Sequence, residues 1–446
     1  MSGDKEQEYF SDGLAEEIIN ALTKIPGLQV IARTSAFAFK GKNEDIRKIA
    51  EVLGVANILE GSVRKSGNRI RFTAQLIEAS KGVHLWSERY DREMEDVFAI
   101  QDEISQAIAG KLRVELSGES LLFQQPIENI EAYNLYLKGR YYLSKFTIES
   151  MTRSKQYFEQ AIAIDPDYAI AWYGLATYYW WFGYLGFIPP KEIYPECKQA
   201  LIKALKLDER IADAHSYMAM LLTSEFDWKG AEREFHRAME LNPKSADVLA
   251  NYSQFYLAPR WLFHDALAAA QKALQLDPLS SHKLFHLGHR YHLLQHHTQA
   301  IEQFLSAIEL NPQGYYAHMF LAQSYICTDR IEEGVQAAET AAKLSKRDPL
   351  ILNSLGVVYA MAGRTKDAQE LVDELHMLAQ KQYVQPTAFV AIYMGLGETD
   401  KCLDYLEKAI DEGDSMIHGT IIDPAFKSMH SHPRYKALLR KMNLEP

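Results

Sequence analysis

The sequence predicts a mostly α-helical protein: a right-handed α-solenoid of helix pairs preceded by a small α/β domain. Between Ser281 and Pro312, apolar residues and one glycine recur at the spacing of two facing helices. Asp-Pro and Asn-Pro dipeptides recur along the chain, at positions 165–166, 242–243, 277–278, 311–312 and 348–349. Residues 1–116 lack this spacing and alternate helical and strand patterns, which is typical of a layered α/β domain.

The stretch from Ser281 to Pro312 shows the helix-pair spacing in full. In a unit of 34 residues, the pattern stands at offsets 4, 7, 8, 11, 20, 24, 27 and 32, which are Leu284, Leu287, Gly288, Tyr291, Ala300, Phe304, Ala307 and Pro312. Gly288 allows the two helices to approach closely, and Pro312 sets the turn into the next unit. This spacing resembles the tetratricopeptide repeat. One pair cannot bury its apolar face alone, so repeats are expected on both sides.

Weaker copies of the spacing extend from residue 131 to residue 413, where we expect about eight repeats. The Asx-Pro dipeptides fall at the junctions. There we expect Asp or Asn to cap the incoming helix, with Pro near its first position. A polar linker is expected at 117–130, and residues 414–446 are expected to form a helical cap over the last apolar face.

The amino-terminal residues predict short helices and strands. Residues 11–24 predict a helix capped by Ser11 or Asp12, and the apolar run Leu28–Ile31 predicts a buried strand. A second helix is expected over 44–53, since a glycine follows it directly.

A hairpin and a closing helix are expected next. The strands 58–65 and 69–78 flank a turn signal at 66–68, and 83–90 is a candidate third strand. The apolar periodicity of 97–116 predicts a long helix that completes an α/β layer.

The same region resembles the TolB-type amino-terminal domain of bacterial signalling proteins that also carry tetratricopeptide repeats. The matching segments are Glu8–Gly13 (EYFSDG), Gly27-Leu28, Ala32–Ser35 (ARTS), Leu59–Val63 (LEGSV) and His84–Asp91 (HLWSERYD). In that family the domain sits beside a DNA-binding, kinase or nucleotide-cyclase domain. The resemblance therefore implies a role in signalling.

The resemblance also implies an apolar strand ahead of the segment that opens this chain. A right-handed crossover would place that strand between Leu28–Ile31 and Ile58–Val63. We expect one of two outcomes. A strand from another chain fills the position, which would give a homo-oligomer through the amino-terminal sheet, or Leu28–Ile31 is displaced and mobile.

Composition narrows the partners and the compartment. The 446 residues carry a net charge of −11 with a pI of about 5.8, which argues against nucleic-acid binding or attachment to an anionic membrane. No run is long and apolar enough to span a membrane, and the acidic first residues do not resemble a signal peptide. The three cysteines are far apart and odd in number, so no disulfide framework is expected. A cytoplasmic location follows as the expectation.

Motifs of catalysis are missing from the sequence. It contains no P-loop, no GxSxG nucleophile elbow, no HExxH zinc motif, no CxxC pair and no EF-hand loop. We therefore expect a protein that is not an enzyme and that needs no cofactor or metal.

Histidines on the first helix of the reference repeat form the most unusual constellation: His282, His286, His289 and His292. Their spacings of four, three and three keep them within a third of the helix circumference. In the repeat family, offsets 2, 5, 6, 9 and 12 of the first helix face the concave groove, and these histidines occupy 2, 6, 9 and 12. Three interpretations are open: a metal site, a pH-sensitive ligand groove, or a solvated polar stripe that binds nothing.

Groove offsets of neighbouring repeats extend this surface with Tyr217, Met220, Asn251, Gln254, Tyr316, Met319, Phe320 and Gln323. Some members of the family grip a peptide's terminal carboxylate with Lys, Arg and Asn at such offsets. Asn251 is the one match to that pattern here. A groove of aromatic, Met, Gln and His side chains suits an extended or helical peptide with apolar anchors, and packing of the inner helices is the alternative.

Two functions fit these observations. The leading one is a non-catalytic adaptor or scaffold that binds a peptide segment of a protein partner in the concave repeat groove. The other is the regulatory half of a bacterial signalling protein (an adenylate or guanylate cyclase, a kinase or a transcription regulator) whose effector domain lies outside this chain.

Overall fold

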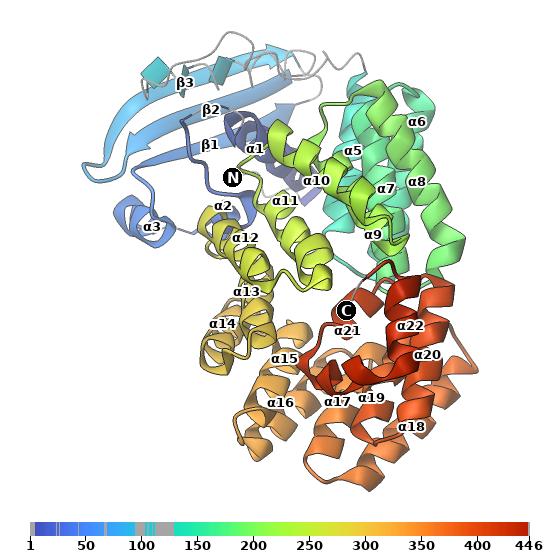
Figure 1. Cartoon of the computed structure of the whole chain (residues 1–446). Helices are drawn as coiled ribbons and strands as arrows, with labels where there is room; N and C mark the ends of the chain where they lie inside the picture. The colour runs from blue at the N-terminus through green and yellow to red at the C-terminus, as the bar shows by residue number, and fades with distance from the viewer. Residues whose placement is uncertain are drawn as a thin grey trace.

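The computed structural model describes residues 5–23, 25, 27–42, 44–66, 69–93, 103–104, 107–108, 110–111 and 129–444. Figure 1 shows a small sheet with helices at one end, followed by a curved array of helix pairs that makes up most of the chain. This helical solenoid with a small amino-terminal sheet is the predicted fold class. The helix expected over 97–116 and the linker expected at 117–130 lie largely outside the described residues.

The described amino-terminal part consists of three helices and three strands. They are α1 (Lys5–Thr23), α2 (Arg33–Phe37), α3 (Ile46–Leu53), β1 (Asn57–Ser66), β2 (Arg69–Glu78) and β3 (Val83–Glu93). The strands pair antiparallel in the order β1-β2-β3, with Phe72 of β2 opposite both Val63 and Tyr90. Alternate residues of β2 from Ile70 to Leu76 are buried, and they share one hydrophobic core with the buried face of α1.

Most of the amino-terminal predictions are confirmed. The hairpin and the third strand are present, and α3 ends at Gly54, which adopts a left-handed conformation. The predicted cap of the first helix is wrong, because α1 begins at Lys5 and both Ser11 and Asp12 lie inside it. The carboxylate of Asp12 instead pairs with Lys40 at 2.5 Å.

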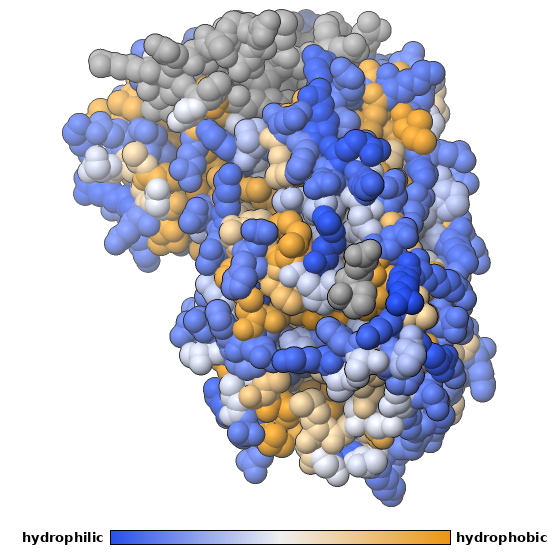
Figure 2. All heavy atoms as spheres, in the orientation of Figure 1, coloured by the Kyte–Doolittle hydropathy of each residue, from blue (hydrophilic) through white to orange (hydrophobic). Residues whose placement is uncertain are grey.

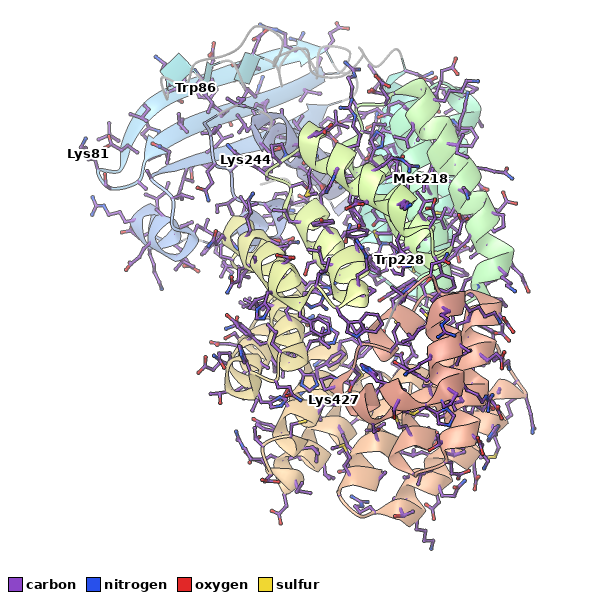
Figure 3. The ribbon with its side chains drawn as sticks, in the orientation of Figure 1. Lys81, Trp86, Met218, Trp228, Lys244 and Lys427 are labelled. Atoms are coloured by element: carbon purple, nitrogen blue, oxygen red, sulfur yellow. The ribbon has the colours of Figure 1, made fainter. Side chains whose placement is uncertain are left out.

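The strand predicted at Leu28–Ile31 is wrong. The segment is irregular and pairs with no described strand. It lies against the solenoid, where Lys244 Nζ donates to the carbonyl of Leu28 at 2.5 Å and the amide of Ala32 donates to the carbonyl of Leu276 at 2.8 Å (Figure 3 labels Lys244). Its apolar side chains pack on the main core, which explains the apolar run without a sheet. Its mobility, and a strand supplied by another chain, stay predictions.

Eight helix pairs follow one another in the part of the chain described from residue 129 onward. They are α5 (Ile130–Leu143) and α6 (Ile148–Ile164), α7 (Ala169–Tyr184) and α8 (Pro190–Leu207), α9 (Ala212–Ser224) and α10 (Trp228–Leu241), α11 (Ala246–Asn251) and α12 (Phe263–Leu276), α13 (Ser281–Leu293) and α14 (His297–Leu310), α15 (Tyr315–Ile326) and α16 (Ile331–Leu344), α17 (Pro349–Met361) and α18 (Thr365–Ala379), and α19 (Thr387–Gly395) and α20 (Thr399–Glu412). Helix α11 continues into a π-helical turn, η2 (Tyr252–Leu257), and a 3-10 turn, η3 (Ala258–Arg260). The chain then forms α21 (Ile417–Thr420), η4 (Pro424–Ser431) and α22 (Pro433–Lys441). The domain boundaries stay predictions.

Glycine and phenylalanine set the spacing within and between pairs. A Cβ atom built on Gly288 of α13 would lie 2.6 Å from Phe304 of α14, so the two helices can keep this distance only without a side chain there. Gly139 and Gly174 face Phe158 in the same way, at 2.4 Å and 2.5 Å. The packing role predicted for Gly288 is confirmed.

The junction dipeptides differ from expectation at four of the five positions. Asp165, Asn242, Asp277 and Asn311 are the carboxyl-terminal caps of the outgoing helices, and the proline that follows each of them lies in the connecting turn. Asp348 alone among the five caps the incoming helix, by accepting from the amide of Leu350 at 3.0 Å, with Pro349 at the first helical position. The dipeptides therefore mark the junctions correctly but act mostly on the helix before them.

The array curves far enough for its last helices to touch its early ones (Figure 1). The indole N–H of Trp228 in α10 donates to the carbonyl of Met442 beyond α22 at 2.8 Å (Figure 3). The hydroxyls of Tyr194 in α8 and Ser415 lie 2.8 Å apart. From the same side, Figure 2 shows hydrophobic residues gathered toward the middle of this face, within a largely hydrophilic surround.

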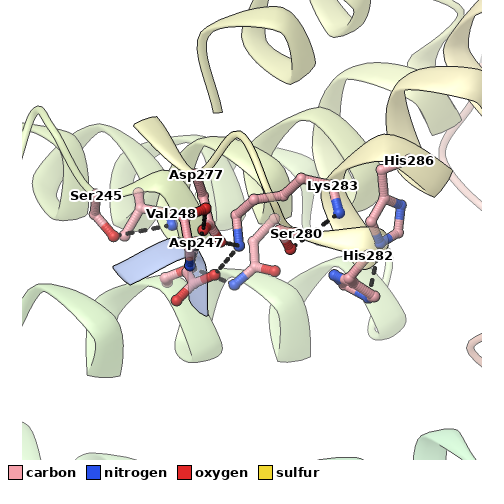
Figure 4. Close-up of polar contacts among 11 residues, drawn as sticks. Ser245, Asp247, Val248, Asp277, Ser280, His282, Lys283 and His286 are labelled. Carbon is pink, nitrogen blue, oxygen red and sulfur yellow. Dashed lines mark hydrogen bonds and ion pairs between the residues drawn. The ribbon is translucent and has the colours of Figure 1, made fainter. Parts of the chain in front are cut away.

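Asp277, between α12 and α13, fastens the amino-terminal part to the solenoid. Its buried Oδ1 accepts from the amide of Ser35 at 3.0 Å and from the hydroxyl of Ser35 at 2.5 Å. Its Oδ2 lies 3.1 Å from Nζ of Lys283, which also pairs with Asp247 at 2.6 Å (Figure 4). Burial lowers the pKa of Lys283, but the two carboxylates outweigh that effect, so the pKa lies above its ordinary value.

Replacing Asp277 by Ala removes the acceptor of Ser35 and one carboxylate from the buried ammonium of Lys283. Breaking a buried ion pair leaves a charge without compensation, so we expect the free energy of unfolding to fall by about 3–5 kcal/mol. The amides of Ala32 and Ser35 should also exchange faster, which hydrogen exchange with mass spectrometry measures. Asn311→Ala is the matched control, because Asn311 caps the next junction, is exposed and makes a local hydrogen bond. Equal losses in both variants would contradict the fastening role.

Replacing Gly288 by Leu should force α13 and α14 apart, because Phe304 leaves no room for a side chain. We expect the free energy of unfolding to fall by about 1–3 kcal/mol through overpacking. Urea unfolding of the variant beside Gly419→Leu measures this, since a Cβ on Gly419 would meet no atom within 4 Å. An unchanged unfolding midpoint for Gly288→Leu would show that the close approach is not required.

Candidate functional site

The four predicted histidines lie along α13 but not in one environment. His286, His289 and His292 are 8%, 6% and 3% exposed, whereas His282 is exposed. The interpretation as a solvated polar stripe is therefore wrong for three of the four. Helix α15 packs over this face of α13, as the 3.0 Å contact between His292 Nδ1 and the hydroxyl of Ser324 shows.

The histidines are held in their neutral forms. His286 and His282 meet through their Nε2 atoms at 2.9 Å (Figure 4). Nδ1 of His289 accepts from the guanidinium of Arg290 at 2.7 Å, which places the ring proton on Nε2. Burial lowers the pKa of His292 to about 3 and holds the pKa values of His286 and His289 well below their ordinary range.

Two of the residues predicted to line the groove contact side chains of the preceding repeat. The hydroxyl of Tyr217 in α9 accepts from the indole N–H of Trp181 at 2.9 Å. The amide of Asn251 in α11 donates to the hydroxyl of Ser216 in α9 at 3.2 Å. The first helices of the second, third and fourth repeats are therefore linked by polar contacts beside the groove.

Aromatic side chains gather around Phe285, which the sequence analysis did not select although it occupies groove offset 5. Its ring centre lies 6.2 Å from that of Tyr316 and 5.5 Å from that of Phe320. The ring of Phe320 in turn lies 4.3 Å from that of His289. Tyr316, Phe320 and Phe285 are each half-buried, so their outer faces are open to a ligand.

The predicted groove residues thus divide into two sets. Those half-buried or exposed are Tyr217, Asn251, Gln254, His282, Tyr316, Phe320 and Gln323. Those buried in the packing between helices are Met220, Met319, His286, His289 and His292. The first set is accessible without rearrangement, and the second supports it from behind. Ligand binding by either set stays a prediction.

The sequence pattern did not point to two buried cations beside the groove, Lys283 and Arg290. Lys283 and Arg290 occupy offsets 3 and 10, which helix geometry turns away from the groove, yet both are buried against neighbouring repeats. Nη1 of Arg290 donates to the carbonyl of Ser253 in η2 at 3.1 Å. Their signal in the sequence is weak, because a cation on an amphipathic helix is usually solvated.

The groove offsets of the first repeat are covered by a helix of the same chain. Counting Gly139 as offset 8, Leu137 and Arg140 stand at groove offsets 6 and 9. A Cβ on Gly13 of α1 would lie 2.4 Å from Leu137, so α1 packs closely on this face. Arg140 forms an ion pair with Glu16 of α1.

The residues that the structure describes offer neither a metal site nor a membrane-spanning helix. No group of three or more His, Cys, Asp or Glu side chains in them could hold a metal ion. No helix described here is long and apolar enough to cross a membrane. Cys197 and Cys402 are buried and Cys327 is exposed, each as a free thiol.

Comparison with known proteins identifies the repeat. Residues 284–313 match the family described as Tetratricopeptide repeat. The chain therefore carries a tetratricopeptide repeat within a helical solenoid, and this repeat is a protein-binding element. The match begins inside the stretch from Ser281 to Pro312, where the spacing is complete, and ends one residue after it.

Two bacterial relatives cover parts of the chain. Putative adenylate cyclase 3 of Rhizobium meliloti is 47% identical over 173 residues, which is 38% of this chain and 30% of the relative. The type IV pilus assembly protein PilF of Pseudomonas aeruginosa is 32% identical over 119 residues, 26% of this chain and 46% of the relative. The chain thus spans less than half the length of either. A solved structure of P. aeruginosa PilF aligns with a TM-score of 0.39 at 23% identity, over 52% of this chain and 96% of that one.

Stability should fall in acid because of the buried neutral histidines. Below a pH of about 6.5 the unfolded chain protonates its histidines, whereas the folded chain cannot protonate His292 until about pH 3. The unfolded state then binds more protons, so the free energy of unfolding decreases by about 1.4 kcal/mol per pH unit for each such histidine. His292→Asn keeps a neutral polar side chain and should reduce this slope between pH 6 and pH 4 by about one proton. Urea unfolding at several pH values measures both slopes, and identical slopes would contradict the assignment.

Proposed function

We propose that the protein is a non-catalytic scaffold that binds a segment of a protein partner along the concave face of its middle repeats. The observation that carries this is the position of α1. An amphipathic helix of the chain itself lies on the groove offsets of the first repeat, held by apolar contact at Leu137 and by the ion pair of Arg140 with Glu16. Groove offsets of the fifth and sixth repeats carry the half-buried aromatic side chains of Phe285, Tyr316 and Phe320, which a partner segment could cover in a similar mode.

The chemistry of those repeats favours apolar anchors. Phe285, Tyr316 and Phe320 form a cluster with large, rigid side chains, which supply contact area at a low cost in conformational entropy. His282 and Gln323 lie beside the cluster on the same two helices and offer polar groups. A partner segment with aromatic or aliphatic residues spaced along one face of a helix would fit this surface.

Selection of random peptides displayed on phage tests this function. Peptides that bind the protein should bind Tyr316→Ala/Phe320→Ala at least about tenfold more weakly, because truncation of central aromatic anchors removes 1.4 kcal/mol or more. Fluorescence anisotropy measures the affinities, and circular dichroism checks that the variant is folded. Leu305→Ala is the control, since Leu305 is a large apolar residue 47% exposed on α14. Equal weakening by both variants, or peptides that bind the double variant normally, would place the binding surface elsewhere.

A second function is supported by the relative named as a putative adenylate cyclase. Its 47% identity over 173 residues, together with the resemblance to the TolB-type domain, supports a regulatory part of a signalling protein whose effector domain lies outside this chain. The reading frame that surrounds the coding sequence of residues 1–446 discriminates between the two functions. A cyclase, kinase or DNA-binding domain in that frame would favour the regulatory role. A cytoplasmic location and self-association through the amino-terminal sheet are further proposals of the same kind.

A further inference from the structure

Arg290 is a buried cation whose surroundings are neutral. Its side chain is among the largest fully buried ones, with 1% of the residue exposed. Lys283 on the same helix is nearly as buried but lies between the carboxylates of Asp247 and Asp277. Within the residues that the structure describes, Arg290 forms no ion pair with a carboxylate. Carboxylates therefore compensate the charge of Lys283 but not that of Arg290.

The contacts of the guanidinium leave one edge available. Nη1 donates to the carbonyl of Ser253 at 3.1 Å, and Nη2 donates to Nδ1 of His289 at 2.7 Å, with Oε1 of Gln254 farther away at 3.5 Å. The Nε–H is buried and has no partner in the described residues. All three acceptors are uncharged, so hydrogen bonding alone compensates the positive charge.

This arrangement is costly for stability and therefore calls for a role. A buried charge without a counter-ion loses its hydration, and an apolar side chain of similar length would avoid that loss. Burial lowers the pKa of Arg290 to about 10, which still leaves the group protonated at neutral pH. Ser253 belongs to η2, a π-helical turn, and such turns are rare and often occur at functional sites.

Gln254 and Tyr184 are neighbours of the guanidinium of Arg290. Gln254 and Tyr184 are both half-buried, and a hydrogen bond between them partly offsets the burial that raises the pKa of Tyr184 to about 12. Tyr316, in the aromatic cluster, is close enough to Tyr184 for the two phenols to influence each other. An incoming group could thus reach the free edge of Arg290 by moving these two side chains, without unfolding a helix.

We propose that Arg290 anchors an oxyanion, a carboxylate or phosphate group carried by the partner segment, at the centre of the concave face. The planar guanidinium would donate its free Nε–H and an Nη2–H to the two oxygens, which are two charge-assisted hydrogen bonds in a dry environment. The site differs from the terminal-carboxylate clamp of other repeat proteins, because Arg290 occupies offset 10 rather than a groove offset. This inference rests on the proposed function and specifies that the partner segment carries a negative charge.

Anion titrations of the intact chain test the proposal. We expect sodium phosphate or sodium acetate, at fixed ionic strength made up with sodium chloride, to raise the melting temperature of the wild-type protein. Without the anion, Arg290→Met should melt at a temperature no lower than that of the wild type. The anion concentration that gives half of the rise in melting temperature should be about tenfold higher, or more, for Arg290→Met than for the wild type. Arg237→Met is the matched control, since Arg237 forms an exposed ion pair with Glu240. A response to phosphate alone would identify a phosphate ligand, and a response to acetate alone a carboxylate ligand.

Several results would overturn the proposal. A wild-type protein that responds to neither anion more than to chloride, or an Arg290→Met protein that responds like the wild type, would do so. If Arg290→Met does not fold, Arg290→Lys replaces it, because Lys keeps the charge but loses the planar fork. An undiminished anion response in Arg290→Lys would then leave Arg290 with a structural role only. Phage-selected peptides that bind Arg290→Met normally would refute the oxyanion site while leaving the peptide groove intact.

Discussion

The buried carboxylate of Asp277 holds together two parts of the chain that share no regular pairing. It binds Ser35 of the amino-terminal part, 242 residues before it in the sequence, and it pairs with Lys283 of the fifth repeat. A second anchor lies at the first repeat, where α1 packs on α5 and Glu16 pairs with Arg140. The amino-terminal part thus spans the first four repeats from end to end. Because a solenoid is held mainly by contacts between neighbouring repeats, such a brace fixes a curvature that the repeats alone leave adjustable.

Contacts between repeats determine which side chains of the concave face are covered and which are accessible. Contacts between the third repeat and the carboxyl-terminal cap, such as that of Trp228 with Met442, draw the two ends of the array toward each other. On α13 the adjacent repeat covers the inner face, so His286, His289 and His292 are buried and neutral rather than solvated. The accessible remainder is a narrow set of aromatic, amide and histidine side chains between Tyr217 and Gln323.

Features that depend on residues close together in the sequence could be predicted, and features that depend on distant residues could not. The approach of Gly288 to Phe304 is local to one helix pair, so periodicity was sufficient to predict it. The hairpin around residues 66–68 is local in the same sense. The segment Leu28–Ile31 depends on a partner that lies far away in the sequence, Lys244, and a period of 34 residues carries no information about that contact. Arg290 was missed for a different reason: an ideal helix turns offset 10 away from the groove, and a cation on an amphipathic helix is usually solvated.

Arg290, a buried cation without a carboxylate partner in the described residues, would give the concave face a way to discriminate between partners. The aromatic cluster around Phe285 would contribute most of the affinity, because burial of apolar area does not depend on a particular partner charge. Arg290 would contribute selectivity, since electrostatic interactions strengthen where water and competing ions are excluded. A segment without an oxyanion would leave the guanidinium as it is in the free protein and gain nothing from it. A segment with an oxyanion at the matching position would compensate a charge that the fold keeps buried, so the cost of that burial in the free protein becomes binding energy in the complex.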